Sequence, residues 1–206
     1  IPGEEYGVGD HVKVYVVDVL SGDRGPRIML SRTHPGFVKR MFELEVPEIQ
    51  EGVVEIINIV REVGYRTKIA IHSKDPNVDA LGACVGNKGV RVNSIVYSLN
   101  GEKIDIIVWS DDPFEYIARA LSPAKVISVE IDEITKSARV IVPDDKLSLA
   151  IGKGGQNVRL AAKLTHWKID VKSESRATEE NEASSSHTDV DDIGDLFSGT
   201  EDINLD

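Results

Sequence analysis

The sequence has one cysteine, Cys84, and few aromatic residues. A single cysteine excludes an intramolecular disulfide, which fits a reducing compartment, so we expect a cytoplasmic protein. Aromatic residues make up 5% of the chain, so stacking on bases would rest on few rings. The chain has no apolar run of about 18 residues and does not start with a charged segment followed by an apolar one. We therefore expect no membrane span, no membrane partner and no signal peptide.

Basic residues are fewer than acidic ones, 24 against 35, and the charge is unevenly placed along the chain. The formal net charge is −11, and residues 174–206 hold eleven acidic residues and one basic residue. That segment accounts for −10, which leaves −1 for residues 1–173. Between Lys146 and Lys168 there are five lysines or arginines and no acid. Salt screens charges beyond roughly 8 Å, so this local stretch can still attract a polyanion.

The chain begins with a strand pattern and then alternates helices and strands. Residues 12–20 and 27–31 are rich in β-branched and apolar residues around a Ser-Gly-Asp turn, which predicts two strands. We interpret residues 1–33 as a β-domain fragment, because two strands alone are marginal. Beyond His34 we predict helices at 37–44, 78–84, 90–99, 113–121 and 156–164, another helix after Asp145, and strands at 53–60, 67–72, 103–109, 126–134, 138–142 and 168–171.

Two parts of this alternating region match each other at a shift of 66 residues. The shift aligns Gly86 with Gly152 and Gly89 with Gly155, and further aligned pairs are Asp79/Asp145, Leu81/Leu147 and Val92/Val158. After a one-residue gap, Lys-Ile-Asp at 103–105 aligns with Lys-Ile-Asp at 168–170. A lone Gly-x-x-Gly is a weak signal, whereas two copies, each between predicted helices and before a matching strand, are far more specific. The alternative is a duplicated unit whose glycines serve only a tight turn.

The glycine loops suit contact with a sugar-phosphate chain. Glycine has no Cβ, so the backbone can approach a phosphate closely, and the helix that follows offers free N–H groups and a positive dipole end. Each loop also carries one lysine, and residues in the next helical turn can reach phosphates or base edges. We predict that these residues bind RNA: Gly86, Asn87, Lys88, Gly89, Arg91, Gly152, Lys153, Gly154, Gly155, Gln156, Asn157 and Arg159. For the residues after each loop, an exposed surface role is an open alternative.

The Gly-x-x-Gly loop between helices, followed by a strand, resembles the KH family, and a helix before two strands resembles its type II order, αββααβ. More specifically, the chain resembles the NusA family of bacterial transcription factors. The matching segments are Leu-Glu-Val-Pro-Glu-Ile at 44–49, Gly-Ala-Cys-Val-Gly at 82–86, Leu-Asn-Gly-Glu-Lys-Ile-Asp at 99–105, Trp-Ser-Asp-Asp-Pro at 109–113 and Ala-Ile-Gly-Lys-Gly-Gly-Gln-Asn-Val-Arg-Leu-Ala at 150–161.

The resemblance implies an α+β fold of tandem type II KH domains, preceded by the last strands of an OB-fold and followed by a disordered acidic tail. The expected boundaries are 1–33 for the OB-fold fragment, 34–110 and 111–173 for the KH domains, and 174–206 for the tail. It also implies a module that binds single-stranded nascent or leader RNA and acts with RNA polymerase in pausing, termination and antitermination. Other transcription factors are further candidate partners, and we expect a monomer.

Two other function classes stay open at this point. RNA-degrading phosphorylases also combine KH and OB-type modules, but the five histidines here are scattered and suggest no metal cluster. We therefore predict no enzyme activity, no cofactor and no metal. A KH pair that binds only protein would be expected to lose its loop glycines or lysines, and this chain keeps both. For the acidic tail, a solubilising role and a partner-binding or self-inhibitory role are both open.

Overall fold

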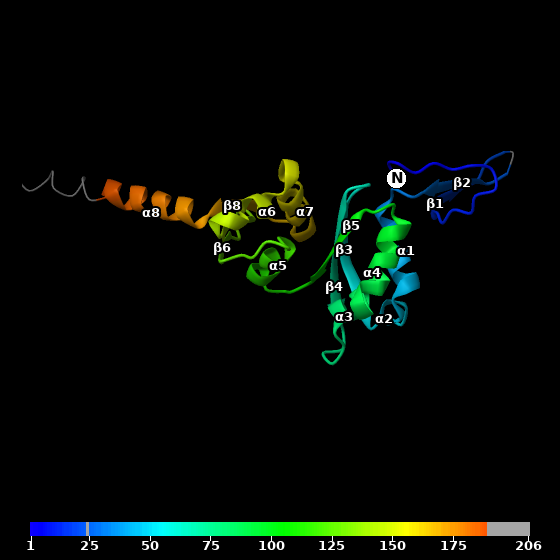
Figure 1. Ribbon diagram of the computed structural model, residues 1–206, viewed down its shortest axis with the longest axis horizontal. Helices are drawn as coiled ribbons and strands as arrows, with labels where there is room; N and C mark the ends of the chain where they lie inside the picture. The colour runs from blue at the N-terminus through cyan, green and yellow to red at the C-terminus, as the bar shows by residue number, and fades with distance from the viewer. Residues whose placement is uncertain (24, 189–206) are drawn as a thin grey trace, which may run out of the picture.

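The computed structural model describes residues 1–23 and 25–188. A two-stranded hairpin precedes two mixed helix-and-strand units, and a helix follows them (Figure 1). The order of elements agrees with the α+β arrangement of tandem KH domains predicted above.

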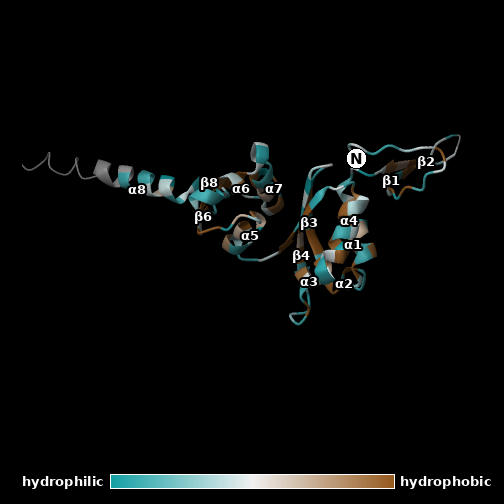
Figure 2. Ribbon diagram, in the orientation of Figure 1, coloured by the Kyte–Doolittle hydropathy of each residue, from teal (hydrophilic) through white to brown (hydrophobic). Residues whose placement is uncertain are grey.

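The N-terminal hairpin consists of β1 (Tyr15–Leu20) and β2 (Arg27–Ser31), paired antiparallel with a shift in register between Val16 and Asp18. Both strands agree with the predicted ones. Their apolar side chains remain open to solvent: Val19, Ile28 and Leu30 are each 56% exposed, and Figure 2 shows apolar residues along these strands. That exposure is what a fragment of a larger β-domain would show, and its assignment to an OB-fold stays a prediction.

The first KH unit contains α1 (Pro35–Glu45), α2 (Pro47–Gln50), β3 (Val54–Glu62), β4 (Arg66–Ser73), α3 (Ala80–Val85), α4 (Val90–Ser98) and β5 (Lys103–Val108). Its sheet order is β3-β4-β5, with β3 antiparallel and β5 parallel to β4. Helix α1 begins where the side chain of His34 accepts a hydrogen bond from the N–H of Gly36. Its apolar face packs on β4 and α4 in one core, formed by Phe37, Met41, Phe42, Ile69, Ile71, Ile95 and Leu99, each at most 2% exposed.

The second KH unit repeats this order with α5 (Pro113–Ala120), β6 (Ser128–Asp132), β7 (Ser137–Val142), α6 (Leu147–Ile151), α7 (Gln156–Thr165) and β8 (Lys168–Ser173). Its sheet order is β6-β7-β8, again with one antiparallel and one parallel pairing. Asp112 caps α5 by accepting a hydrogen bond from the N–H of Phe114, with Pro113 at the first helical position. An aspartate cap followed by proline at the first helical position is a common start of an α-helix.

The two KH units share a core. Ala70 and Ile107, on the face of the first sheet opposite its own helices, cluster with Ile117, Leu121 and Leu164 of the second unit. Polar contacts fix the arrangement further: the side-chain amide of Asn58 donates to the carbonyl of Leu164 at 3.1 Å, and the ammonium of Lys68 donates to the carbonyl of Ser122 at 2.9 Å. The two units are therefore packed directly against each other.

Residues 174–188, the first part of the predicted acidic tail, form a helix after β8. Helix α8 spans Glu174–Thr188, and its Glu180 contacts Lys172 Nζ at 2.6 Å and Arg139 at 3.3 Å. The net charge of the segment does not predict contacts with these two cations, which lie on β7 and β8. Figure 1 shows α8 extending away from the two units. The acidic and apolar stretch at 191–197, for which two roles were considered, lies outside the described residues.

Candidate nucleic-acid interface

The two glycine loops have nearly the same backbone. The first glycine has φ 74° and ψ 171° in one loop (Gly86) and φ 76° and ψ 169° in the other (Gly152). The N–H of the last glycine donates to the carbonyl of the first at 3.1 Å in both, from Gly89 and from Gly155. The sequence repeat is therefore a repeat of conformation, and each loop leads directly into a helix, α4 or α7.

The first loop glycine is required by both conformation and space. A Cβ at Gly86 would lie 2.8 Å from Cγ of Arg91, and one at Gly152 would lie 2.8 Å from the backbone nitrogen of Asn157. The third loop position is left-handed in both loops, occupied by Lys88 with φ 51° and by Gly154 with φ 59°. Lysine accepts that conformation at a cost of about 1 kcal/mol, which the second loop avoids by using glycine.

The loop lysines are exposed, as are the two other middle residues. Lys88, Lys153, Asn87 and Gly154 all lie on the surface. The N-termini of α4 and α7 begin one residue beyond each loop, so the positive end of each helix dipole adds to the charge of the lysine. Each loop therefore combines glycines that allow close approach of the backbone, a positive charge and exposure to solvent, which binding a phosphate requires.

Arg91, predicted to contact RNA, is engaged with the protein. Its Nη1 donates to the carbonyl of Ala83 at 2.6 Å and to Oε2 of Glu48 at 3.0 Å. Its side chain also covers Gly86. Arg91 therefore holds the end of α3 against the loop, and the ion pair with Glu48 of α2 is a contact that the sequence pattern did not reveal.

Asn157 occupies the equivalent position in the second loop and requires a correction. It is 1% exposed, and its side-chain amide donates at 3.0 Å to the carbonyls of both Ala150 and Leu121. A buried amide with two backbone acceptors has no surface to offer a nucleotide. Asn157 therefore supports the loop, as Arg91 does in the first unit, and the prediction that it binds RNA does not fit this conformation.

Gln156 and Arg159 meet a residue of the first unit. Glu62, at the end of β3, accepts from Gln156 Nε2 at 3.1 Å and from Arg159 Nη2 at 3.2 Å. Arg159 also donates from Nη1 to the carbonyl of Gly154 at 3.1 Å and keeps 47% of its side chain exposed. The second loop is thus tied to the first unit through Glu62. No local signal marks that glutamate, because its partners lie more than 90 residues away in the chain.

A cleft of about 660 Å³ lies beside the helix that carries the first loop. Its apolar wall is formed by Leu81 of α3 together with Ile106 and Val108 of β5. Because β5 is the edge strand of its sheet, one side of its backbone has no neighbouring strand in the described structure.

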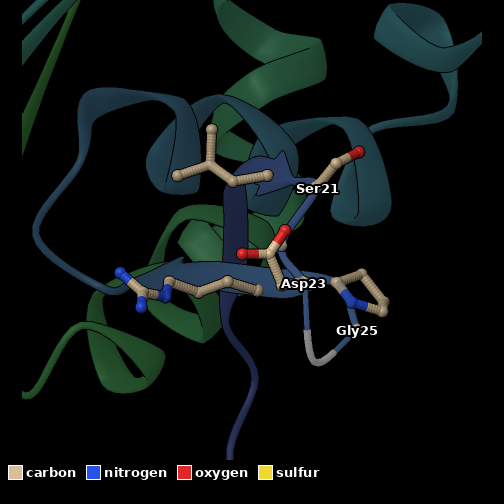
Figure 3. Close-up of a pocket in the computed structure, with 7 residues that line it drawn as sticks. Ser21, Asp23 and Gly25 are labelled. Carbon is tan, nitrogen blue, oxygen red and sulfur yellow. The ribbon is translucent and has the colours of Figure 1, made fainter.

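A separate cleft of about 620 Å³ lies in the turn of the N-terminal hairpin. Figure 3 shows Ser21, Asp23 and Gly25 lining it. It belongs to the β1–β2 hairpin, while the loop residues belong to the two KH units, so we do not include it in the interface.

Three further features of the described residues concern metal-ligand groups, the single cysteine and membrane-spanning helices. Over residues 1–23 and 25–188, no group of three or more His, Cys, Asp or Glu side chains could hold a metal ion. Cys84 is buried, and burial raises the pKa of its thiol to about 12, so it is a poor nucleophile. Within the same described part of the chain, no helix is both long and apolar enough to cross a membrane.

Comparison with known proteins decides the family. Residues 32–109 match the family described as the NusA-like first KH domain, and residues 113–179 match the NusA-like second KH domain. The chain belongs to the NusA family. This confirms the resemblance inferred from the loop repeat, and the two matches correspond to the two structural units that carry the NusA-type loops.

Curated NusA relatives align over most of this chain. The protein named transcription termination/antitermination protein NusA is 58% identical over 192 residues in Halalkalibacterium halodurans, covering 91% of this chain and 50% of that relative. The Bacillus subtilis protein of that name is 57% identical, covering 87% of this chain and 48% of its own length. The Mycobacterium tuberculosis H37Rv protein is 55% identical, at 84% and 50%. The chain thus spans about half the length of these NusA relatives.

A solved structure supports the fold of the NusA-type pair. The protein described as "Crystal structure of APE1850" aligns with a TM-score of 0.50 and 20% identity, covering 67% of this chain and 97% of that chain. At that identity the likeness concerns the fold alone.

Proposed function

We propose that this NusA-type KH pair binds single-stranded RNA as part of a transcription elongation factor. The bound RNA would be a nascent or leader transcript, and the factor would act with RNA polymerase in the cytoplasm to modulate pausing, termination and antitermination. The observation that carries the proposal is the pair of loops of matching conformation, each with an exposed lysine at the start of a helix. The names of the NusA relatives support the transcriptional role.

The physical basis is the KH clamp. A Gly-x-x-Gly loop grips the backbone of about four nucleotides, so two loops would hold roughly eight. Shared packing between the units lowers the entropy cost of engaging both loops, because the second loop need not be brought into place after the first has bound. The proposal involves no chemistry on RNA, and intact RNA after prolonged incubation is the expected result of a degradation assay.

The test replaces loop charge while respecting loop conformation. Asn87→Asp with Lys88→Asp alters the first loop, and Lys153→Asp alters the second; Asp tolerates the left-handed conformation at position 88 better than most residues. Gly154 is left in place because of its positive φ. The control is Lys39→Asp, at an exposed lysine on α1. Binding of a labelled RNA of about twelve nucleotides is measured by fluorescence anisotropy.

We expect each loop variant to weaken binding about tenfold, or roughly 1.4 kcal/mol, and the control to leave it within about twofold. Circular dichroism checks that all variants are folded. Unchanged affinity of both loop variants at near-physiological salt would contradict the proposal.

A further inference from the structure

We infer that the second KH unit completes the nucleotide groove of the first, with Lys125 as the phosphate-contacting residue on its far wall and Arg119 as a positioning residue. The inference rests on the proposed RNA-binding function and adds residues that lie outside both glycine loops. A nucleotide in this groove would place its base on the first unit and its phosphate beside the second.

The cleft is built from both units. Leu81, Ile106 and Val108 line one side, and Arg119, Pro123 and Lys125 line the other. Leu81 is 40% exposed, so apolar surface is available for a base. Along α3, Leu81 precedes Gly86 by five residues, or about 7.5 Å of helix rise, so the cleft lies near the first loop.

The far wall is held in place from three directions. Lys68 in the first sheet donates to the carbonyl of Ser122 at 2.9 Å. Asn157, beside the second loop, donates to the carbonyl of Leu121 at 3.0 Å. Arg119 Nη1 donates to the carbonyl of Val108 on β5 at 3.1 Å, and its Nη2 pairs with Glu115. Contacts from both units therefore fix the groove before any ligand binds, which reduces the cost of ordering it.

The chemistry of the walls favours a nucleotide. Arg119 and Lys125 are the cations among the described residues that line the cleft, and since Arg119 is paired with Glu115, Lys125 is the cation open to a phosphate. Lys125 is exposed and has no ion-pair partner within 4.0 Å among residues 1–23 and 25–188. The free side of β5 offers backbone donors and acceptors to a base edge, next to an apolar surface for its face. An extended peptide without acidic residues could also pair with β5, but it would leave the Lys125 ammonium without a partner.

The first test uses Lys125→Gln, with Lys39→Gln as the matched control. Both lysines are exposed and both changes remove one positive charge, but Lys39 lies on α1, away from this cleft. We expect Lys125→Gln to weaken binding of the RNA about threefold to tenfold. It should also reduce the slope of log affinity against log salt by about 0.7, the value for one phosphate contact on a single strand. The control should change neither quantity.

The second test is direct. Lys125→Cys introduces a reactive thiol, while Cys84 stays protected because it is buried and its pKa is raised to about 12. A photoreactive group attached at position 125 should crosslink to the RNA, and an unlabelled RNA in excess should compete it away. The same group attached through Lys39→Cys should give little crosslink.

The outcomes separate this inference from the proposed function. If the loop variants abolish binding but Lys125→Gln changes neither affinity nor salt slope and position 125 gives no crosslink, the composite groove is refuted and RNA binding by the loops stands. If the loop variants bind RNA normally, the proposed function itself fails. If the RNA crosslink at position 125 is removed by an excess of an extended peptide but not by an excess of unlabelled RNA, the groove is a protein-binding edge and the inference is overturned.

Discussion

Replacing the first glycine of the second loop should damage the protein more than replacing the third. Gly152 has φ 76° and ψ 169°, a region that is essentially restricted to glycine, where another residue costs about 1–3 kcal/mol. An added Cβ would also lie 2.8 Å from the backbone nitrogen of Asn157, and backbone cannot rotate aside as a side chain can. Gly154→Ala is the matched control, because its φ of 59° is strained but nothing lies within 4 Å of an added Cβ.

We expect Gly152→Ala to lower the free energy of unfolding by about 2–3 kcal/mol and Gly154→Ala by about 1 kcal/mol. The first loop tolerates a residue other than glycine at this position, since Lys88 adopts the same left-handed conformation there. Urea denaturation followed by tryptophan fluorescence measures both, because Trp109 follows the first unit's last strand and Trp167 lies in the second unit. Gly152→Ala should also weaken RNA binding. Displacing Asn157 would break its hydrogen bonds to the carbonyls of Ala150 and Leu121, which support the second loop.

An equal or smaller loss of stability in Gly152→Ala than in Gly154→Ala would refute the reasoning. It would mean that the loop relaxes around an added methyl group, and that neither the positive φ nor the contact with Asn157 constrains it. Gly86→Ala offers an internal comparison, since its Cβ would meet the Cγ and Cβ of Arg91 rather than backbone. We expect its cost to fall between those of the other two variants.

Three other changes test separate parts of the structure. Glu62→Gln removes the carboxylate that Arg159 contacts; because both side chains are more than a third exposed, stability should change by less than about 1 kcal/mol, while RNA affinity at low salt should rise, and a fall in affinity would contradict this. The pKa of Glu4 is lowered to about 2, chiefly by the hydrogen bond from Arg32, so its carboxylate stabilises the fold above pH 4.5 and that contribution is lost as the pH falls toward 2. Glu4→Gln should therefore flatten the stability profile between those values in acid titrations, and an unaltered profile would argue against the ion pair. Deleting residues 174–206 removes a net charge of −10 and should tighten RNA binding at low salt, whereas unchanged binding would exclude competition by the tail.

The sequence predicted the parts of the molecule that depend on local pattern. The repeat at a shift of 66 residues gave both loops, and the alternation of apolar segments gave the order of helices and strands. The NusA-type family matches then confirmed the resemblance that rested on these patterns.

The contacts between distant residues could not be predicted in the same way. Asn157 is polar and follows a loop, so its burial depends on the carbonyls of Leu121, just after α5, and Ala150 of α6, which only the folded chain brings near. Arg159 depends likewise on Glu62, across the contact between the two units. Helix α8 begins the segment predicted as a disordered tail, and its Glu180 contacts Lys172 and Arg139 of the second sheet. Hydrogen bonds and ion pairs between residues that are distant in the chain produce no periodic pattern in the sequence.

The most direct test of the account is crosslinking of the intact chain to single-stranded RNA, with the attached residues mapped individually. We expect crosslinks at residues 86–93 and 152–159, around the two glycine loops. Crosslinks that fall elsewhere on the chain while both loops stay unmodified would contradict the central claim that these loops hold the RNA backbone.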